Sequence, residues 1–339
     1  MNQSPKYGWW GYAVIVALLH IIGILFLFYA AKNSPGLWGM GLLAYTLGLR
    51  HAFDVDHIAA IDNTVRKLVQ QRKNPHGVGF YFSLGHSTVV FLMAIATAFS
   101  VQWAQKEMPG FQEIGGIIGA SVSGLFLVII GIMNLVILVQ LYKLFTQFRQ
   151  GRHQADEFER LLDARGFFSR FIGPLYKLIG RSWHVYPLGF LFGLGFDTAS
   201  EISLLAMSAG AAKEALPFVT ILSFPLLFAA GMSLMDTADG IFMTKAYRWA
   251  FNTPLRKLYY NLSVTSLAVV AALLIGMVEL AQVLSEKFGL EGTVWSWIQD
   301  LDFGSLGYML VGLFIIAWAV SVGVWKWFRL EERWGSMDA

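Results

Sequence analysis

Long apolar stretches separated by short polar segments dominate this chain. Eight of them approach or exceed the roughly 20 residues that a helix needs to cross about 30 Å of hydrocarbon. They run over 9–31, 36–62, 78–100, 113–142, 184–210, 216–243, 258–284 and 304–328. The pattern predicts an all-α, polytopic integral membrane protein with eight transmembrane helices. We expect one transmembrane domain over 1–339, with its longest polar connection at 143–183.

Composition supports the membrane assignment. Hydrophobic residues make up 56% of the 339 positions and charged residues 14%, and the mean hydropathy is +0.56. These values are not those of a soluble domain. The chain has no cysteine, which excludes disulfides and thiolate metal sites.

The distribution of basic residues predicts the orientation. Retained loops of membrane proteins are enriched in Lys and Arg. With the N-terminus inside, twenty of the 25 basic residues fall in cytoplasmic segments and four fall on the opposite side. We therefore expect both termini in the cytoplasm and the protein in the cytoplasmic (inner) membrane. The net charge of +3 follows from this topology and needs no nucleic-acid partner.

The segment 50–63 reads RHAFDVDHIAAIDN and carries ionisable groups inside a predicted span. Such groups are costly in a bilayer, so a functional role is the default interpretation. On a regular helix, His51, Asp54 and His57 share a face of about 120°. Asp56 points elsewhere, so it either supports a neighbouring helix or indicates that the helix unwinds here.

Three further spans carry polar side chains at helical spacing. The third has His86 between Ser83 and Ser87, the fifth has Asp197 and Glu201, and the sixth has Asp236 beside Ser233 and Thr237. Imidazoles and carboxylates are ligands for divalent transition metals. We predict an intramembrane metal site drawn from span 2 and completed by spans 3, 5 and 6. Its candidate ligands are His51, Asp54, Asp56, His57, His86, Asp197, Glu201 and Asp236.

These segments resemble the nickel/cobalt transporter (NiCoT) family of bacterial and fungal permeases. The family's H-x4-D-H motif corresponds to His51, Asp56 and His57, whereas the helical wheel favours Asp54 over Asp56. The other family motifs resemble SLGHSTVV at 83–90, LGFDTASE at 194–201 and GMSLMDTADG at 231–240. The resemblance covers nearly the whole chain, and four motifs in order are far more specific than one.

The resemblance implies uptake of Ni2+, Co2+ or both by a single-component carrier, with the metal ion as substrate and the lipid bilayer as surroundings. It implies no enzymatic activity, no resident cofactor and no ATPase subunit. The sequence has no G-x4-GK[ST] phosphate-binding loop. An inside-negative potential could drive the flux, and proton coupling through Asp197, Glu201 or Asp236 is a hypothesis.

Two other functions use similar residues. A divalent-metal exporter would share the ligands and reverse the flux. A membrane-embedded metalloenzyme would ordinarily need more clustered histidines than the four in these spans, and there is no H-E-x-x-H sequence. His20, alone in the first span, is interpreted as a hydrogen-bonded packing residue.

Two echoes raise the hypothesis of an internal repeat. Phe53-Asp54 is echoed by Phe196-Asp197, and the segment from Ser83 (SLGHS) by the segment from Ser233 (SLMDT). The offset of three spans would make such a repeat inverted, as in many secondary transporters. The different depths of His86 and Asp236 in their spans argue against it.

Overall fold

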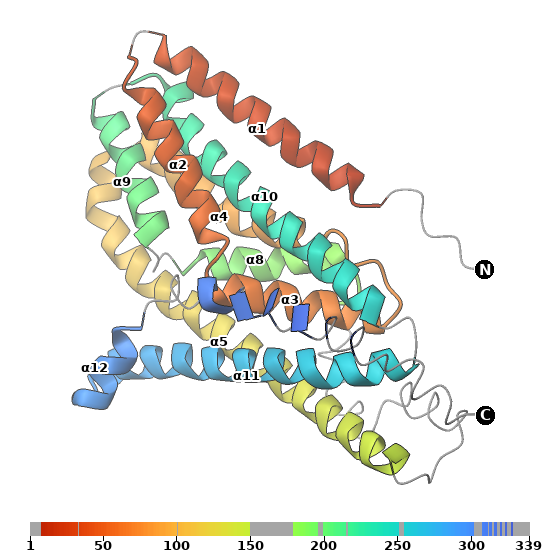
Figure 1. Cartoon of the computed structure of the whole chain (residues 1–339). Coiled ribbons are helices and arrows are strands. Elements are labelled where there is room, and N and C mark those ends of the chain that lie inside the picture. Colours follow the sequence, from red (N-terminus) through yellow and green to blue (C-terminus); the bar gives the residue numbers. More distant parts are fainter. Residues whose placement is uncertain are drawn as a thin grey trace.

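The computed structural model describes residues 8–32, 34–99, 101–149, 179–195, 199–214, 216–250, 254–301 and scattered positions between 307 and 327. Every regular element among these residues is a helix, as the sequence predicts (Figure 1). Most of the connection predicted at 143–183 and most of the predicted span 304–328 lie outside the described residues. The eight-span plan and the cytoplasmic termini therefore remain predictions.

Among the residues that the structure describes, five helices are long and apolar enough to cross a membrane. They are α1 (Trp10–Ala31), α4 (Val78–Phe99), α5 (Val101–Arg149), α10 (Phe218–Ala250) and α11 (Pro254–Phe288). Their apolar stretches coincide with five predicted spans, and α5 continues well beyond its predicted range on both sides. α1 turns many large apolar side chains outward, among them Ile21 and Leu25, as a lipid-facing helix does.

Two other predicted spans are each broken into shorter helices. The range 36–62 contains α2 (Leu37–His51) and the start of α3 (Val55–Gln70). The range 184–210 contains the second half of η1 (Ser182–Val185), then α8 (Tyr186–Gly193) and most of α9 (Ala199–Lys213). In both pairs the second helix leaves in a new direction (Figure 1). The prediction of a single helix over 36–62 was therefore wrong, because Asp54 has extended backbone torsions (φ −62°, ψ 138°) that interrupt the helix.

Buried apolar side chains form two main cores on either side of these breaks. The first core joins α1, α2, α9 and the first half of α10 through residues such as Leu27, Ala44, Leu204 and Phe228. The second core joins α3, α8, the start of α4 and the end of α10, with support from α5 and α11. Ala52 belongs to the first core and Val55 to the second. The break after α2 therefore lies where the two cores meet.

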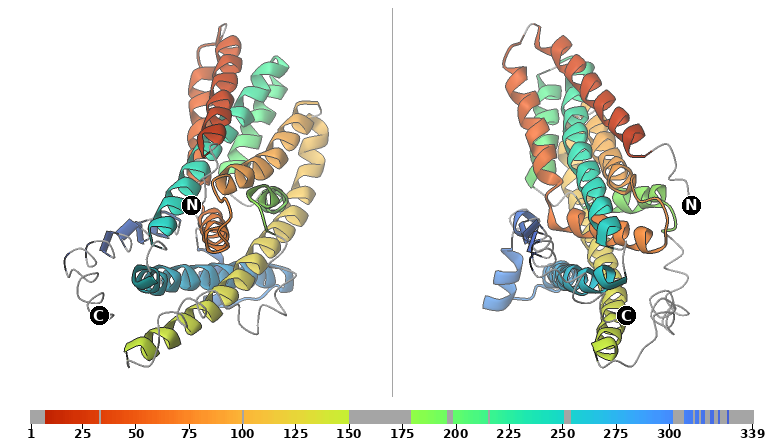
Figure 2. Two further views of the ribbon diagram at one scale, coloured as in Figure 1. Left: turned by 90° about the vertical axis from the view of Figure 1, so that its right-hand side faces the viewer. Right: turned by 45° about the vertical axis from the view of Figure 1, so that its right-hand side comes forward.

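Helices α5 and α11 cross each other at one side of the molecule (Figure 2). Gly124 and Gly276 lie at this crossing, where a side chain on either would approach the backbone carbonyl of the other. A short helix, α12 (Thr293–Gln299), follows α11. Helices α5 and α11 contribute buried residues to the second core, in which α3 lies, and, among the described residues, none to the first core. In the view of Figure 1, α11 runs below α3.

Candidate metal centre

Three buried histidines from three helices face one another. His51 is the last residue of α2, His57 lies in the first turn of α3, and His86 lies in the first half of α4. One ring nitrogen from each can be chosen so that all lie within 4.8 Å of one another. The ring centroids are 4.6 to 4.8 Å apart. Exposed fractions of 1 to 3% place this triad in the protein interior.

The helix break explains how two of these histidines meet. The sequence prediction put His51 and His57 on one face of a continuous helix. The chain instead turns at Ala52, Phe53 and Asp54 before α3 begins, so the two rings approach each other across a corner. The prediction that both histidines face one site agrees with this arrangement, whereas the regular helix assumed for it was wrong. The alternative interpretation, in which the helix unwinds here, is the correct one.

Each histidine has a carboxylate beside it. Asp54 Oδ2 lies 3.0 Å from His51 Nδ1, and Asp236 Oδ2 of α10 lies 3.4 Å from His57 Nδ1. Glu201 Oε1 of α9 lies 2.8 Å from His86 Nε2. All three carboxylates are buried. Such partners fix the orientation of a ligating imidazole and offset the charge of a bound cation.

Asp56 has a different environment from Asp54. Its Oδ1 accepts a hydrogen bond from the backbone N–H of His57 at 2.8 Å, and its side chain is half-buried. It therefore sits at the start of α3, where an acid is favoured by the helix dipole. Asp197, also a candidate ligand, lies outside the described residues.

Several polar atoms at the triad have no hydrogen-bond partner among the described residues. His57 Nε2 and Asp236 Oδ1 belong to this group. His57 Nδ1 and Asp236 Oδ2 face each other at 3.4 Å but make no hydrogen bond. Buried polar groups normally have partners, so unpaired ones in a folded protein need a reason. A cation bound between these residues would supply one.

The donor set suits a borderline transition metal. Imidazole is a ligand for nickel, cobalt, zinc and copper, and carboxylates add charge without the softness of thiolates. Two nitrogens bound to one ion at about 2.1 Å stand at most about 4.2 Å apart. His51 Nε2 and His86 Nε2 are 2.9 Å apart, and one nitrogen from each of the three rings lies within 4.8 Å of the others, so at most a small closing movement would bring all three onto one ion.

A second polar network holds α3 to its neighbours. Tyr247 of α10 donates a 2.6 Å hydrogen bond to Asp62 Oδ1. Asn63 Oδ1 accepts from Arg66 and from Asn134 of α5, each at 2.7 Å. The sequence gives no reason to single out Tyr247 or Asn63, because neither type is a metal ligand. Asn63 lies in the polar run at 62–67 inside an otherwise apolar region, whereas Tyr247 has no such signal.

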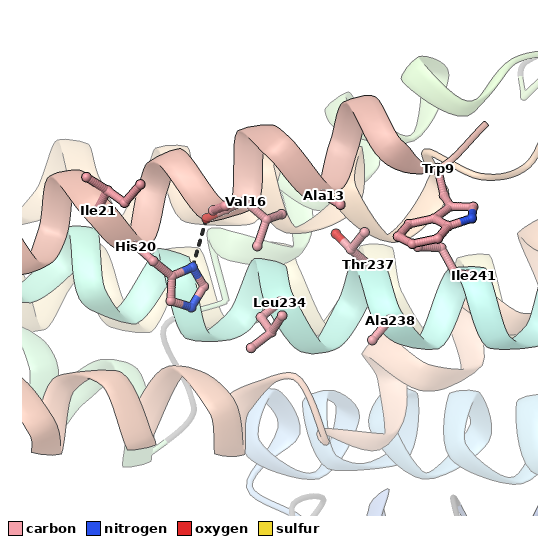
Figure 3. A pocket seen from close by; sticks show the side chains of 10 residues that line it. Trp9, Ala13, Val16, His20, Ile21, Leu234, Thr237, Ala238 and Ile241 are labelled. Carbon is pink, nitrogen blue, oxygen red and sulfur yellow. Dashed lines mark hydrogen bonds between the residues drawn. The ribbon is translucent and has the colours of Figure 1, made fainter. Parts of the chain in front are cut away.

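A cavity of about 490 Å³ lies between α1 and α10 (Figure 3). Its lining is mostly apolar and includes Val16, Ile21, Leu234 and Ile241. His20 borders it and contacts the carbonyl oxygen of Val16 through Nδ1 at 2.8 Å. This agrees with the interpretation of His20 as a packing residue. The cavity shares no residue with the histidine triad or its carboxylates.

Apolar spanning helices around a buried cluster of three histidines define a multi-pass membrane protein with a candidate transition-metal site. The family comparison is specific: residues 37–324 match the NicO family, described as high-affinity nickel-transport protein. The chain belongs to this family. The resemblance drawn from the four motifs is thereby confirmed.

Named relatives cover almost the same length. The nickel transporter NixA of Staphylococcus aureus is 58% identical over 332 residues, covering 98% of both chains. The high-affinity nickel-transport protein NixA of Helicobacter pylori is 54% identical, covering 94% of this chain and 97% of its own. The cobalt transport protein NhlF of Rhodococcus rhodochrous is 41% identical, covering 89% and 88%. No solved structure matches the chain.

Proposed function

We propose that this protein is a secondary transporter that imports Ni2+, Co2+ or both through the histidine triad. The observation that carries the proposal is the convergence of His51, His57 and His86 from three helices in the interior of a membrane protein. Family membership and relatives named for nickel and for cobalt support this substrate class. Such relatives are transporters, which favours a carrier over an enzyme.

The triad can replace hydration water without holding the ion permanently. Three imidazoles offer nitrogen ligands, and Asp54, Glu201 and Asp236 bring carboxylates beside them. The ligands come from α2, α3 and α4, and the carboxylates also from α9 and α10. Because the groups stand on separate helices, a relative movement of these helices widens the site and weakens binding. A carrier needs this balance between binding and release.

The membrane potential is sufficient to favour import. Moving one charge across 100 mV is worth roughly 2.3 kcal/mol, so a dication gains about 4.6 kcal/mol on reaching the negative side. This driving force needs no nucleotide. Proton coupling through Glu201, Asp236 or Asp197 is a further hypothesis, which a pH gradient imposed in place of the potential would test.

Uptake of radioactive Ni2+ into proteoliposomes with an inside-negative potential tests the proposal. We expect saturable uptake, competition by Co2+, and a loss of at least about tenfold in each of His51→Ala, His57→Ala and His86→Ala. His76→Ala is the matched control, since His76 lies in the turn after α3, outside the triad. A folded protein that binds metal but drives only efflux from loaded vesicles would contradict import and favour an exporter.

A further inference from the structure

The two broken segments occur in the same order relative to a long helix. α2 and α3 are followed by α4, and α8 and α9 are followed by α10. The sequence echo Phe-Asp falls at each break, at 53–54 and at 196–197. The second echo falls on α4 and α10, where SLGHS begins at Ser83 and SLMDT at Ser233. Two halves of similar plan would account for this order of elements, although the second echo is four residues out of register with the helix crossings described next.

Each half packs on the long helix of the other through the same four-residue pattern. Tyr45-Thr-Leu-Gly48 of α2 crosses Phe228-Ala-Ala-Gly231 of α10. Tyr186-Pro-Leu-Gly189 of α8 crosses Phe82-Ser-Leu-Gly85 of α4. Both crossings therefore pair Tyr-x-x-Gly on a broken segment with Phe-x-x-Gly on a long helix.

The contacts within the two crossings are also the same. In each, a glycine lies against the backbone carbonyl of the aromatic residue on the opposite helix. The four contacts are Gly48 with Phe228, Gly231 with Tyr45, Gly85 with Tyr186, and Gly189 with Phe82. A Cβ at any of these glycines would overlap that carbonyl or crowd it. Two unrelated helix crossings would not be expected to place the same residue types in the same four contacts.

The two long helices lie beside each other at the centre of this arrangement. Ser83 Oγ of α4 donates a 3.1 Å hydrogen bond to Ser233 Oγ of α10. The crossings align Phe82 and Gly85 with Phe228 and Gly231. A two-fold axis that exchanges the two crossings therefore passes between α4 and α10.

The two hydrophobic cores are also built from corresponding elements of the two halves. The first core contains α2, α9 and the first half of α10, and the second contains their counterparts α8, α3 and the start of α4. The symmetry is limited to these elements, because α1 packs on α10 near Gly23 whereas α5 packs on α11. The crossings pair His86 with Met232 and not with Asp236, so the unequal depths of His86 and Asp236 do not argue against the symmetry.

We propose that the protein consists of two inverted halves related by a two-fold axis between α4 and α10, and that the two broken segments are its moving arms. The inference rests on the proposed transport function. In one conformation α2 and α9 close one end of the path to the triad. In the other, their counterparts α8 and α3 close the opposite end. The corners after His51 and Gly193 are where the arms bend.

Reversible cross-linking tests the reciprocal movement, and the cysteine-free chain gives it a clean background. One cysteine pair, Trp38→Cys with Lys213→Cys, spans the free ends of α2 and α9. A second, Lys73→Cys with Arg181→Cys, spans the end after α3 and the start of η1, where Ser182 Oγ donates to Asn74 O at 2.7 Å. The control pair, Leu125→Cys with Leu274→Cys, joins α5 and α11 near their crossing.

Saturating Ni2+ should change the cross-linking rates of the first two pairs by several-fold in opposite directions and leave the control rate unchanged. Cross-linking either pair with a short methanethiosulfonate reagent should stop uptake, and reduction should restore it. Equal or same-direction changes in the two pairs would overturn the proposal. Uptake by the reduced variants, measured in the same vesicles, tests the transport function separately, because the rate comparison requires only that the protein binds Ni2+.

Discussion

Asp54 and Asp56 stand two positions apart, yet the structure gives them different neighbours. Asp54 contacts the ring of His51, and Asp56 accepts a hydrogen bond from the backbone of His57. We expect Asp54→Asn to weaken Ni2+ binding by about 10- to 100-fold, because the substitution removes the negative charge beside the His51 ring and the carboxylate that orients it.

Asp56→Asn should have a smaller effect on affinity, because the asparagine keeps an oxygen for the backbone N–H of His57. Calorimetric titration of the purified variants with Ni2+ measures both affinities. A larger loss in Asp56→Asn than in Asp54→Asn would mean that the aspartate of the family motif, and not Asp54, contacts the ion.

Tyr247 provides a test of the polar network beside the metal centre. Tyr247→Phe leaves Asp62 Oδ1 buried without its 2.6 Å donor. We expect a loss of about 1–3 kcal/mol in the free energy of unfolding, read from the denaturation midpoint. Tyr142→Phe, on an exposed part of α5, is the matched control and should change little. An unchanged midpoint for Tyr247→Phe would show that another group takes over the hydrogen bond.

At the scale of elements, hydropathy found the five long helices but not the breaks in 36–62 and 184–210. An apolar composition indicates that a segment is buried in lipid or protein, but it does not indicate where the backbone changes direction. The break before α3 depends on extended torsions at Asp54 and on packing of its two sides into different cores. Neither leaves a periodic signal. The cluster of charges at 50–63 was the only sequence feature that marked the place.

The crossing of α2 and α10 provides a prediction at this scale. Gly48→Ala places a methyl group into the carbonyl of Phe228, whereas Gly39→Ala on the same helix meets nothing within 4 Å. We expect Gly48→Ala to reduce both stability and uptake, and Gly39→Ala to leave both near wild type. Gly189→Ala should match Gly48→Ala, because its crossing has the same contacts. The measurements are melting temperature in detergent and uptake in vesicles.

At the scale of the whole molecule, the sequence indicated the residue types of the site and the four segments that carry them. It could not indicate which side chains meet. His86 and Glu201 are 115 residues apart, and only the packing of α9 beside α4 brings them together. The role of Asp197 remains a prediction. The hypothesis of an inverted repeat could not be decided from echoes of two to five residues, whereas matching helix crossings give it a geometric basis.

We propose that histidines from α2, α3 and α4 bind the transported ion together. Nickel K-edge X-ray absorption of the purified, Ni2+-loaded protein tests it most directly, because imidazole rings give a distinct multiple-scattering signal. We predict three imidazole ligands in the wild type and two in His86→Ala, with His76→Ala unchanged. A spectrum that contains only oxygen ligands, or that is unaffected by His86→Ala, would contradict the account.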